Sequence, residues 1–407
     1  MRRLLFCLLT LLPLCAEAEF LWRYSVGGPV AGNPVVHDRF VYVTGGNRLH
    51  VLNETGELTW SYDAGAQTFS SAVLHGDVIY LLADNGLHAI DKGGKKLWHF
   101  ETVDGPLEVE GTTMGWGDGR FTDPWAWYRS APSVSDGRVI FGNRQGTFAV
   151  DAGTGTQLWH ARTGTTHTRP ALHDDVVVVG SWDNHLYGLR RDDGAVTWKT
   201  ESRLPTGQMA GWLGWEGFHL DPVIHEGIVY VGSRGTHFYA IDATSGVEKW
   251  SWKHPTSWVG SPAIVSDEVI YFAMSDGYCL VGLETRMGNQ SLLFRNTFYN
   301  FARPQADDDH VYMASLSGEL FAVDKSSGKG RRIFATENSK ANLSELQSAT
   351  GGLEFLHSTK GGYTHENASK DVARMLSKLD SLLSLTLDGK VLYAGSAGGM
   401  LYAISVQ

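Results

Sequence analysis

The chain has 407 residues, of which 43% are hydrophobic and 19% charged, so it is not a disordered polyampholyte and has enough apolar side chains for a packed core. Its formal net charge of -10 at pH 7 argues against general affinity for nucleic acid or anionic lipid, because both require clustered cations. Glycine is in excess, with 48 residues, and it is accompanied by 14 tryptophans without any Gly-X-Y period. This composition is typical of many tight turns between short strands.

The N-terminal segment has the pattern of an export signal. A basic head is followed by an apolar run over residues 4–14 and by a small-x-small cleavage site that ends at Ala18. We therefore expect residues 1–18 to be a signal peptide, and the mature chain to be periplasmic or secreted. The apolar run is too short to span a bilayer. Attachment of a lipid at Cys15 is the alternative, disfavoured because Leu14 stands where a lipobox has Gly or Ala.

A unit of four short strands recurs along the chain. Residues 221–250 contain three strand-like segments separated by turn signals, then a Thr-Ser-Gly turn and a fourth strand. A tryptophan marks the fourth strand in six places, Trp22, Trp60, Trp98, Trp159, Trp198 and Trp250, which are 38, 38, 61, 39 and 52 residues apart. Two further copies lack this marker and end at Phe294 and Phe334. The spacing predicts a unit of about 38 residues with two insertions.

The two ends of the chain complete one unit between them. The last copy, which starts at Leu383, has only three strands, whereas the segment Phe20–Val26 carries Trp22 with no strands before it. Counting them together predicts an all-β fold, an eight-bladed β-propeller of four-stranded antiparallel blades whose last blade is closed by the N-terminal strand. Closure of the ring protects strand edges from recruiting another chain. We therefore treat residues 19–407 as one domain.

The repeats resemble the PQQ-like β-propeller repeat family, whose motif reads approximately Ala-x-Asp-x-x-Thr-Gly-x-x-x-Trp. The best matches are AVDAGTGTQLW at 149–159, AIDATSGVEKW at 240–250 and the shorter AIDKGGKKLW at 89–98. The resemblance covers residues 20–407 and implies the fold, but it says little about function. In physical terms, the glycine permits the turn between the third and fourth strands, and the tryptophan fills space between adjacent blades.

Three long insertions interrupt the repeat, at about residues 104–129, 203–219 and 337–382. All three fall in connections between one blade and the next, which emerge on the same face as the turns after the second strands. We therefore expect a loop-rich face. Within the third insertion, Asp371 to Leu383 has the spacing of an amphipathic helix, which either packs on the propeller rim or docks a partner.

The candidate ligand- or partner-binding residues lie on that face. They are Arg129, His167, Arg169, His219, Asp221, Trp258 and Arg303 before first strands at the channel mouth, Trp182 and Arg234 in the turns after second strands, and Trp116, Trp125, Trp127, Trp212 and Trp215 among the aromatic residues of the insertions. Three arginines before first strands, Arg129, Arg169 and Arg303, suggest recognition of a carboxylate or another anion. Solvated or structurally paired roles for each, and a lid packed on itself, remain alternatives. We predict no catalytic residue, and the scattered histidines predict no metal site.

Two functional classes remain open. The resemblance implies either an exported scaffold of the BamB-like kind, which binds no cofactor, or a quinoprotein oxidoreductase that holds PQQ beside Ca²⁺. Quinoproteins commonly clamp the quinone between a tryptophan and a disulfide of adjacent cysteines, but the mature chain keeps only Cys279. Trp182, Asp221 and Arg303 could still imitate part of a quinone site.

We favour a non-catalytic periplasmic propeller, monomeric and without a cofactor, which binds an envelope protein, a glycan or a small anionic ligand through its loop-rich face. Nucleic acid is not an expected partner, and no transmembrane segment is expected. A PQQ-dependent dehydrogenase or a PQQ-binding accessory protein is the alternative.

Overall fold

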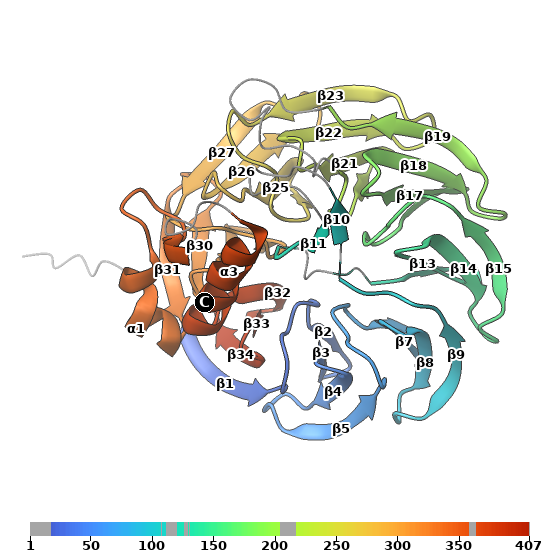
Figure 1. Ribbon diagram of the computed structural model, residues 1–407, viewed down its shortest axis with the longest axis horizontal. Coiled ribbons are helices and arrows are strands. Elements are labelled where there is room, and N and C mark those ends of the chain that lie inside the picture. The colour runs from blue at the N-terminus through green and yellow to red at the C-terminus, as the bar shows by residue number, and fades with distance from the viewer. Residues whose placement is uncertain are drawn as a thin grey trace, which may run out of the picture.

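Eight four-stranded antiparallel sheets are arranged as blades around a central axis in the computed structural model (Figure 1). The structure describes residues 18–106, 108–110, 120–125, 129, 131–203, 217–357 and 364–406. The predicted all-β, eight-bladed propeller is therefore confirmed. None of the helices in the described part of the chain has the length and apolarity to cross a membrane.

The first four blades each use four consecutive strands, running from the channel to the rim. Blade one contains β2 (Val35–His37), β3 (Phe40–Gly45), β4 (Arg48–Leu52) and β5 (Leu58–Asp63). Blade two contains β6 (Val73–His75), β7 (Val78–Ala83), β8 (Gly86–Asp91) and β9 (Lys96–Glu101). Blade three contains β12 (Ser133–Ser135), β13 (Arg138–Asn143), β14 (Gly146–Asp151) and β15 (Gln157–Ala161). Blade four contains β16 (Ala171–His173), β17 (Val176–Gly180), β18 (His185–Arg190) and β19 (Val196–Glu201).

The next three blades repeat this arrangement. Blade five contains β20 (Val223–His225), β21 (Ile228–Gly232), β22 (His237–Asp242) and β23 (Glu248–Lys253). Blade six contains β24 (Ile264–Ser266), β25 (Val269–Ala273), β26 (Cys279–Glu284) and β27 (Gln290–Arg295). Blade seven contains β28 (Gln305–Ala306), β29 (His310–Ala314), β30 (Glu319–Asp324) and β31 (Gly330–Ala335). A separate hairpin of β10 (Glu108–Glu110) and β11 (Arg120–Thr122) lies in the insertion between blades two and three.

Blade eight joins the two ends of the chain, as predicted. It contains β32 (Leu382–Asp388), β33 (Val391–Ser396), β34 (Met400–Ser405) and, as its outermost strand, β1 (Glu19–Ser25). The antiparallel register pairs Glu19 with Ser405 and Ser25 with Met400. The ring is therefore closed by hydrogen bonds between strands and not by continuity of the chain.

Each repeat tryptophan packs against the next blade around the ring. Trp159 of blade three lies on Gly194, which has a φ of +71° in the blade-four turn, and a Cβ added there would come within 2.6 Å of the indole. The indole N–H of Trp159 also donates a hydrogen bond to the carbonyl oxygen of Arg191 at 2.8 Å. Trp22, Trp98, Trp198 and Trp250 donate in the same way. The tryptophan is therefore an inter-blade hydrogen-bond donor as well as an apolar filler, which sequence analysis missed.

Two helices from the third insertion cover one side of blades seven and eight. Helix α1 spans Glu337–Leu346, and helix α3 spans His365–Leu379. The predicted amphipathic helix therefore exists, but it starts before Asp371 and stops at Leu379, because Asp380 takes a left-handed conformation. Leu383, expected on this helix, lies in β32 instead.

A buried histidine in blade two makes stability depend on pH. His88 is 3% exposed, and its imidazole contacts the Tyr62 hydroxyl at 3.0 Å and Asn85 Oδ1 at 2.9 Å. Burial, followed by the neighbouring His99, lowers the pKa of His88 from 6.5 to about 4. The unfolded chain therefore takes up a proton at a higher pH than the folded chain, and stability falls as the pH drops from 6.5 towards 4.

We expect wild type to lose about 2–3 kcal/mol more of its unfolding free energy than His88→Gln between pH 7 and pH 4. Urea unfolding at both pH values measures this difference. His75→Gln, at an exposed position of the same blade, should keep the wild-type pH dependence. An unchanged pH dependence in His88→Gln would contradict the assignment.

Candidate functional site

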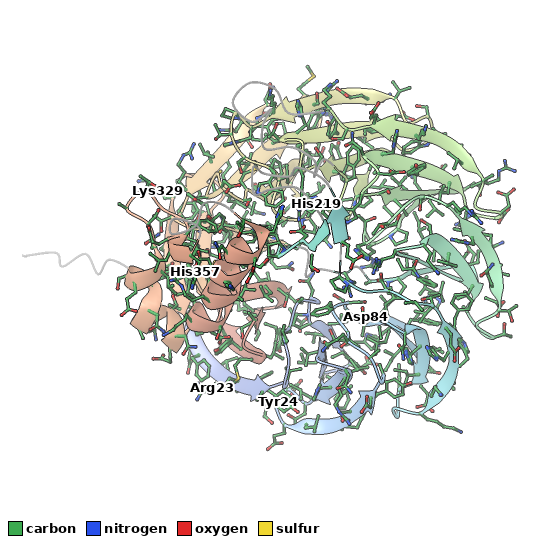
Figure 2. All side chains as sticks on the ribbon, viewed as in Figure 1. Arg23, Tyr24, Asp84, His219, Lys329 and His357 are labelled. Atoms are coloured by element: carbon green, nitrogen blue, oxygen red, sulfur yellow. The ribbon has the colours of Figure 1, made fainter. Side chains whose placement is uncertain are left out.

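The loop-rich face, formed by the turns after the second strands and the connections between blades, brings together side chains from distant parts of the chain. Trp182 follows β17, Arg234 follows β21, and Trp258 precedes β24. His219 precedes β20 and lies towards the centre of the ring, whereas Arg23 lies at the rim (Figure 2).

Arg234 is the centre of an aromatic cluster on this face. Its guanidinium carbon lies 4.6 Å from the ring centre of Trp182 and 4.0 Å from that of Trp258. Its Nη1 forms an ion pair with Asp123 at 2.7 Å, and the two side chains are 2% and 0% exposed. A desolvated guanidinium stacked on two indoles gains from both the aromatic faces and the carboxylate. We call Asp123, Trp182, His219, Arg234 and Trp258 the Arg234 cluster.

The electrostatics of the Arg234 cluster favour a fixed charge state. Burial lowers the pKa of Arg234 to about 10, although the charge of Asp123 acts to raise it. Because this pKa is above 7, the guanidinium stays charged at neutral pH. Burial raises the pKa of Asp123, and the charge of Arg234 opposes this shift. Burial and the charge of Arg234 hold the pKa of His219 well below its ordinary value. The cluster therefore contains one ion pair and one neutral imidazole.

His219 lies between the two tryptophans of the cluster. Its ring centre is 5.4 Å from that of Trp182 and 6.0 Å from that of Trp258, with a stacked geometry on Trp258. Neither ring nitrogen of His219, nor Nε1 of Trp182, has a hydrogen-bond partner of good geometry among the residues that the structure describes.

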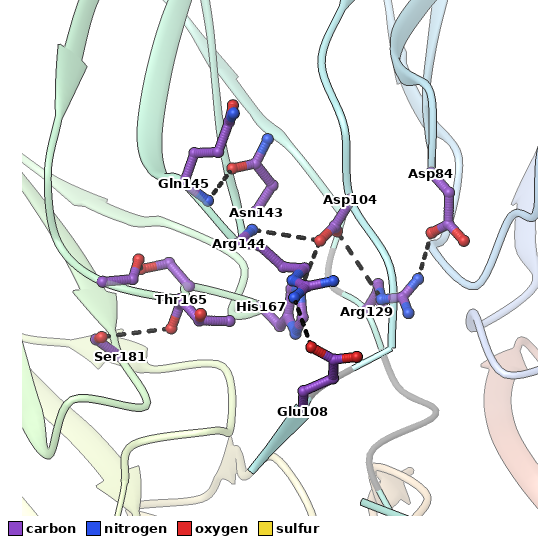
Figure 3. A network of polar contacts seen from close by, with 12 residues as sticks. Asp84, Asp104, Glu108, Arg129, Asn143, Arg144, Gln145, Thr165, His167 and Ser181 are labelled. Carbon is purple, nitrogen blue, oxygen red and sulfur yellow. Dashed lines mark hydrogen bonds and ion pairs between the residues drawn. The ribbon is translucent and has the colours of Figure 1, made fainter. Parts of the chain in front are cut away.

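A second polar network lies beside the first insertion and is centred on Asp104 (Figure 3). Asp104 Oδ1 accepts a hydrogen bond from the backbone N–H of Arg144 at 3.2 Å and contacts His167 Nε2 at 3.0 Å. Arg129 forms an ion pair with Asp84 and approaches Asp104 at 3.9 Å. The side chains of Asp104, Arg129 and His167 are all less than a tenth exposed. The network therefore attaches the start and the end of the first insertion to blades two to four.

The two carboxylates of this network have opposite pKa shifts. Burial raises the pKa of Asp84, against the charge of Arg129. Burial acts on Asp104 in the same direction, but the hydrogen bond and charge of His167, with the charge of Arg129, outweigh it and lower the pKa of Asp104. The neighbouring cavity measures only about 20 Å³. It has space for about one water molecule and not for an organic ligand.

The three arginines expected to converge on an anion occupy different surroundings. Arg129 belongs to the Asp104 network. Arg169 is exposed, and its backbone N–H donates to the buried carboxylate of Asp221 at 2.7 Å. Arg303 is half-buried, and its Nε has no partner of good geometry in the described part of the chain. In the described part of the chain, the three arginines therefore lie in separate surroundings, and the anion site stays a hypothesis.

The predicted tryptophans of the insertions are described only in part. Trp125 is 6% exposed and packs on Phe301, with ring centres 5.6 Å apart, and on Tyr299 at 5.3 Å. It shares one hydrophobic cluster with Trp258 and with residues of helix α3, so pieces of the first and third insertions pack together. Trp116, Trp127, Trp212 and Trp215 lie outside the described residues.

Sequence analysis missed the acidic partners of this face. Asp84, Asp104 and Asp123 hold the arginines, but none of them belongs to the repeat motif. The sequence feature that could have pointed to a buried acidic partner is Asp123, which is followed by Pro124 and Trp125 within an aromatic segment. Its partner Arg234 is more than a hundred residues away in sequence, so local patterns could not pair the two.

Two of the residues proposed for a quinone site, Trp182 and Asp221, contact other parts of the protein instead. Trp182 already contacts Arg234 and His219, and the buried Asp221 accepts the N–H of Arg169. Cys279 is buried and has no disulfide partner in the part of the chain that the structure describes. This donor set does not fit a stacked quinone beside a calcium ion. On the opposite face, His225 Nε2, at the end of β20, pairs with Glu268 at 3.1 Å beside the exposed Glu226, and we assign no metal to them.

Comparison with known proteins extends over nearly the whole chain. A sequence model of the family described as outer membrane protein assembly factor BamB matches residues 16–118, 126–200 and 203–407. Over 257 residues, the chain is 30% identical to serine/threonine-protein kinase AfsK of Streptomyces coelicolor, covering 57% of this chain and 29% of that protein. Over 115 residues, it is 27% identical to outer membrane protein assembly factor BamB of Nitrosomonas eutropha, covering 28% and 26%. The chain thus spans less than a third of the length of these curated relatives.

Solved structures show the same fold at low sequence identity. BamB from Moraxella catarrhalis superposes with a TM-score of 0.68 and 15% identity, covering 95% of this chain and 99% of that one. The computationally designed Ika8 protein superposes with a TM-score of 0.64 and 13% identity, covering 96% and 100%.

Eight blades, repeat tryptophans and a ring closed by its own ends define this chain as a β-propeller of PQQ-like repeats. Because the family match covers all but short gaps, the chain belongs to the family described as outer membrane protein assembly factor BamB.

Proposed function

We propose that the protein is an exported, non-catalytic scaffold of the cell envelope that binds a partner protein through its loop-rich face. The observation that carries the proposal is the shared packing of this face, where Trp125, Trp258 and helix α3 belong to one hydrophobic cluster. A face built from separate insertions and held by buried ion pairs offers a rigid surface, which lowers the entropic cost of binding a partner. Family membership supports an assembly role, and the expected signal peptide supports a periplasmic location.

The buried charges of the face favour binding over chemistry. Arg234 and Arg129 each face a carboxylate, and Asp221 accepts a backbone hydrogen bond. Groups held in this way stabilise loops, whereas a general base needs a lone pair directed at a substrate. The quinoprotein alternative receives no supporting observation from these contacts.

The proposal is tested by photo-crosslinking in the native envelope. A photoreactive amino acid at Arg144, which is 39% exposed in the turn after β13, should capture a defined envelope protein. The matched control is Asp175, which is 88% exposed in a turn on the opposite face and should capture none. Equal capture at both positions, or capture at neither, would overturn the proposal. Native mass spectrometry of the purified protein would reveal a retained quinone and so support the alternative.

A further inference from the structure

A groove of about 880 Å³ lies at the junction of blades seven and eight, where the two ends of the chain meet. We call it the seam groove and define it by Phe20, Arg23, Arg331, Arg332, Phe334 and Lys340. Its lining residues come mainly from the outermost strands β31 and β1 and from helix α1. These three elements are neighbours in Figure 1. Its volume is in the upper range of ordinary ligand pockets.

The seam groove exists because ring closure removes a covering turn. At six other junctions, the glycine turn between the third and fourth strands of one blade lies on the tryptophan of the blade before it, as Gly288 lies on Trp250. At the junction of blades six and seven, Gly330, the first residue of β31, lies on Phe294. Blade eight has no such turn, since β34 and β1 belong to opposite ends of the chain. Phe334, at the position of blade seven that matches Phe294 of blade six, therefore lines an open groove and packs on Tyr402, with ring centres 5.3 Å apart.

Cations gather in this groove although the protein as a whole is acidic. Arg23, Arg331 and Lys340 are exposed, and Arg332 is exposed with an ion pair to Glu319 at 2.7 Å. Among its described lining residues, the groove has one carboxylate, Glu337, whose pKa is lowered first by the hydrogen bond and charge of Lys340 and further by Arg23. Cations therefore outnumber carboxylates in the groove, which complements an anionic ligand.

The walls of the groove also suit an extended chain. Strands β31 and β1 are each the last strand of their sheet, so each presents an outer edge to a segment that adds as a further strand. Phe20 is 50% exposed and offers an apolar contact beside the charges.

We propose that the seam groove binds an acidic peptide segment of a partner protein in extended conformation, with its carboxylates on Arg23 and Arg331 and an apolar side chain on Phe20. This second surface is separate from the loop-rich face and goes beyond the proposed function. A bilayer of anionic lipid fits less well, because the net charge of -10 repels an extended anionic surface, whereas a short peptide senses only the field within about 10 Å of the groove.

Fluorescence anisotropy with the full chain tests the proposal. The probe is a fluorescein-labelled peptide, Glu-Phe-Glu-Val-Glu-Phe-Glu-Ser, with a second peptide that has Lys in place of each Glu. The acidic peptide should bind, the basic peptide should not, and added salt should weaken binding. The charge reversal R23E/R331E should weaken binding by about tenfold or more, since it turns two attractive contacts into repulsive ones.

The matched control reverses two exposed lysines on the outermost strands of other blades, K96E/K199E, and should bind as wild type. Because Arg23 lies in the closing strand, K340E on helix α1 provides a second variant that leaves β1 intact, and it should weaken binding in the same direction. Wild-type affinity in both R23E/R331E and K340E would overturn the proposal. Binding of phosphatidylglycerol vesicles with the same variant dependence, and no binding of the peptide, would also overturn it in favour of a lipid surface.

Discussion

Replacing Asp123 by Asn is expected to lower the unfolding free energy by about 3–5 kcal/mol, because it leaves a buried guanidinium without its counter-ion. Asp123 and Arg234 are 0% and 2% exposed at their side chains, so water cannot replace the lost charge without opening the face. The substitution keeps the size of the side chain and its Oδ1, which accepts the N–H of Trp125 at 2.9 Å. The loss of unfolding free energy in this variant therefore measures the effect of removing the charge of Asp123. Urea unfolding followed by near-UV circular dichroism measures it.

Two further variants separate a buried pair from an exposed one. Asp192→Asn removes a carboxylate that is 73% exposed and pairs with Arg138 at 2.9 Å, and it should cost less than about 1 kcal/mol. The double variant D123L/R234M should regain most of the stability that D123N loses, since apolar side chains of similar size can replace a buried ion pair. Equal losses in D123N and D192N would show that the Asp123 pair is solvated.

A chain that begins at Gly27, without strand β1, is expected to lose more than half of its net stability, which for a domain is about 5–15 kcal/mol. Without β1, the whole edge of β34 is unpaired, and Trp22 no longer packs on Tyr393 or on Gly56 of blade one. Thermal unfolding should start at a lower temperature than in the chain that begins at Glu19. The exposed edge should also cause self-association in size-exclusion chromatography.

Adding the missing strand in trans tests the cause of that loss. A synthetic peptide of residues 19–26 should restore the thermal transition and the elution volume of the chain that begins at Glu19, whereas a scrambled peptide should not. Full stability of the truncated chain without the peptide would mean that the other seven blades close the ring unaided.

The repeat was readable from sequence because its determinants are local. A turn, a strand period and a tryptophan recur within about 38 residues, and each has a direct structural cause. The Gly194 turn on Trp159 illustrates this, since both residues stand in copies of one motif. Even the unusual closure could be predicted, because Trp22 had no preceding strands and the last copy lacked one.

The site was less predictable because its contacts join distant segments. Trp182, His219, Arg234 and Trp258 were named as candidates from their positions in the repeat, and the structure brings them together. Asp123 comes from an insertion with no repeat to align, so its pairing with Arg234 could be found only in three dimensions. The seam groove arises from a missing turn, and a missing element leaves no motif in the sequence.

The pairing of β1 with β34 also fixes the order in which the protein can fold. Strand β1 has its partner at residues 400–405, so blade eight cannot form until both segments have emerged in the compartment where the protein folds. Blades one to seven use only neighbouring strands and can assemble as they emerge. Strand β1 must therefore stay unpaired while the chain between it and β34 emerges, which exposes it to proteases, chaperones or wrong partners before the ring closes.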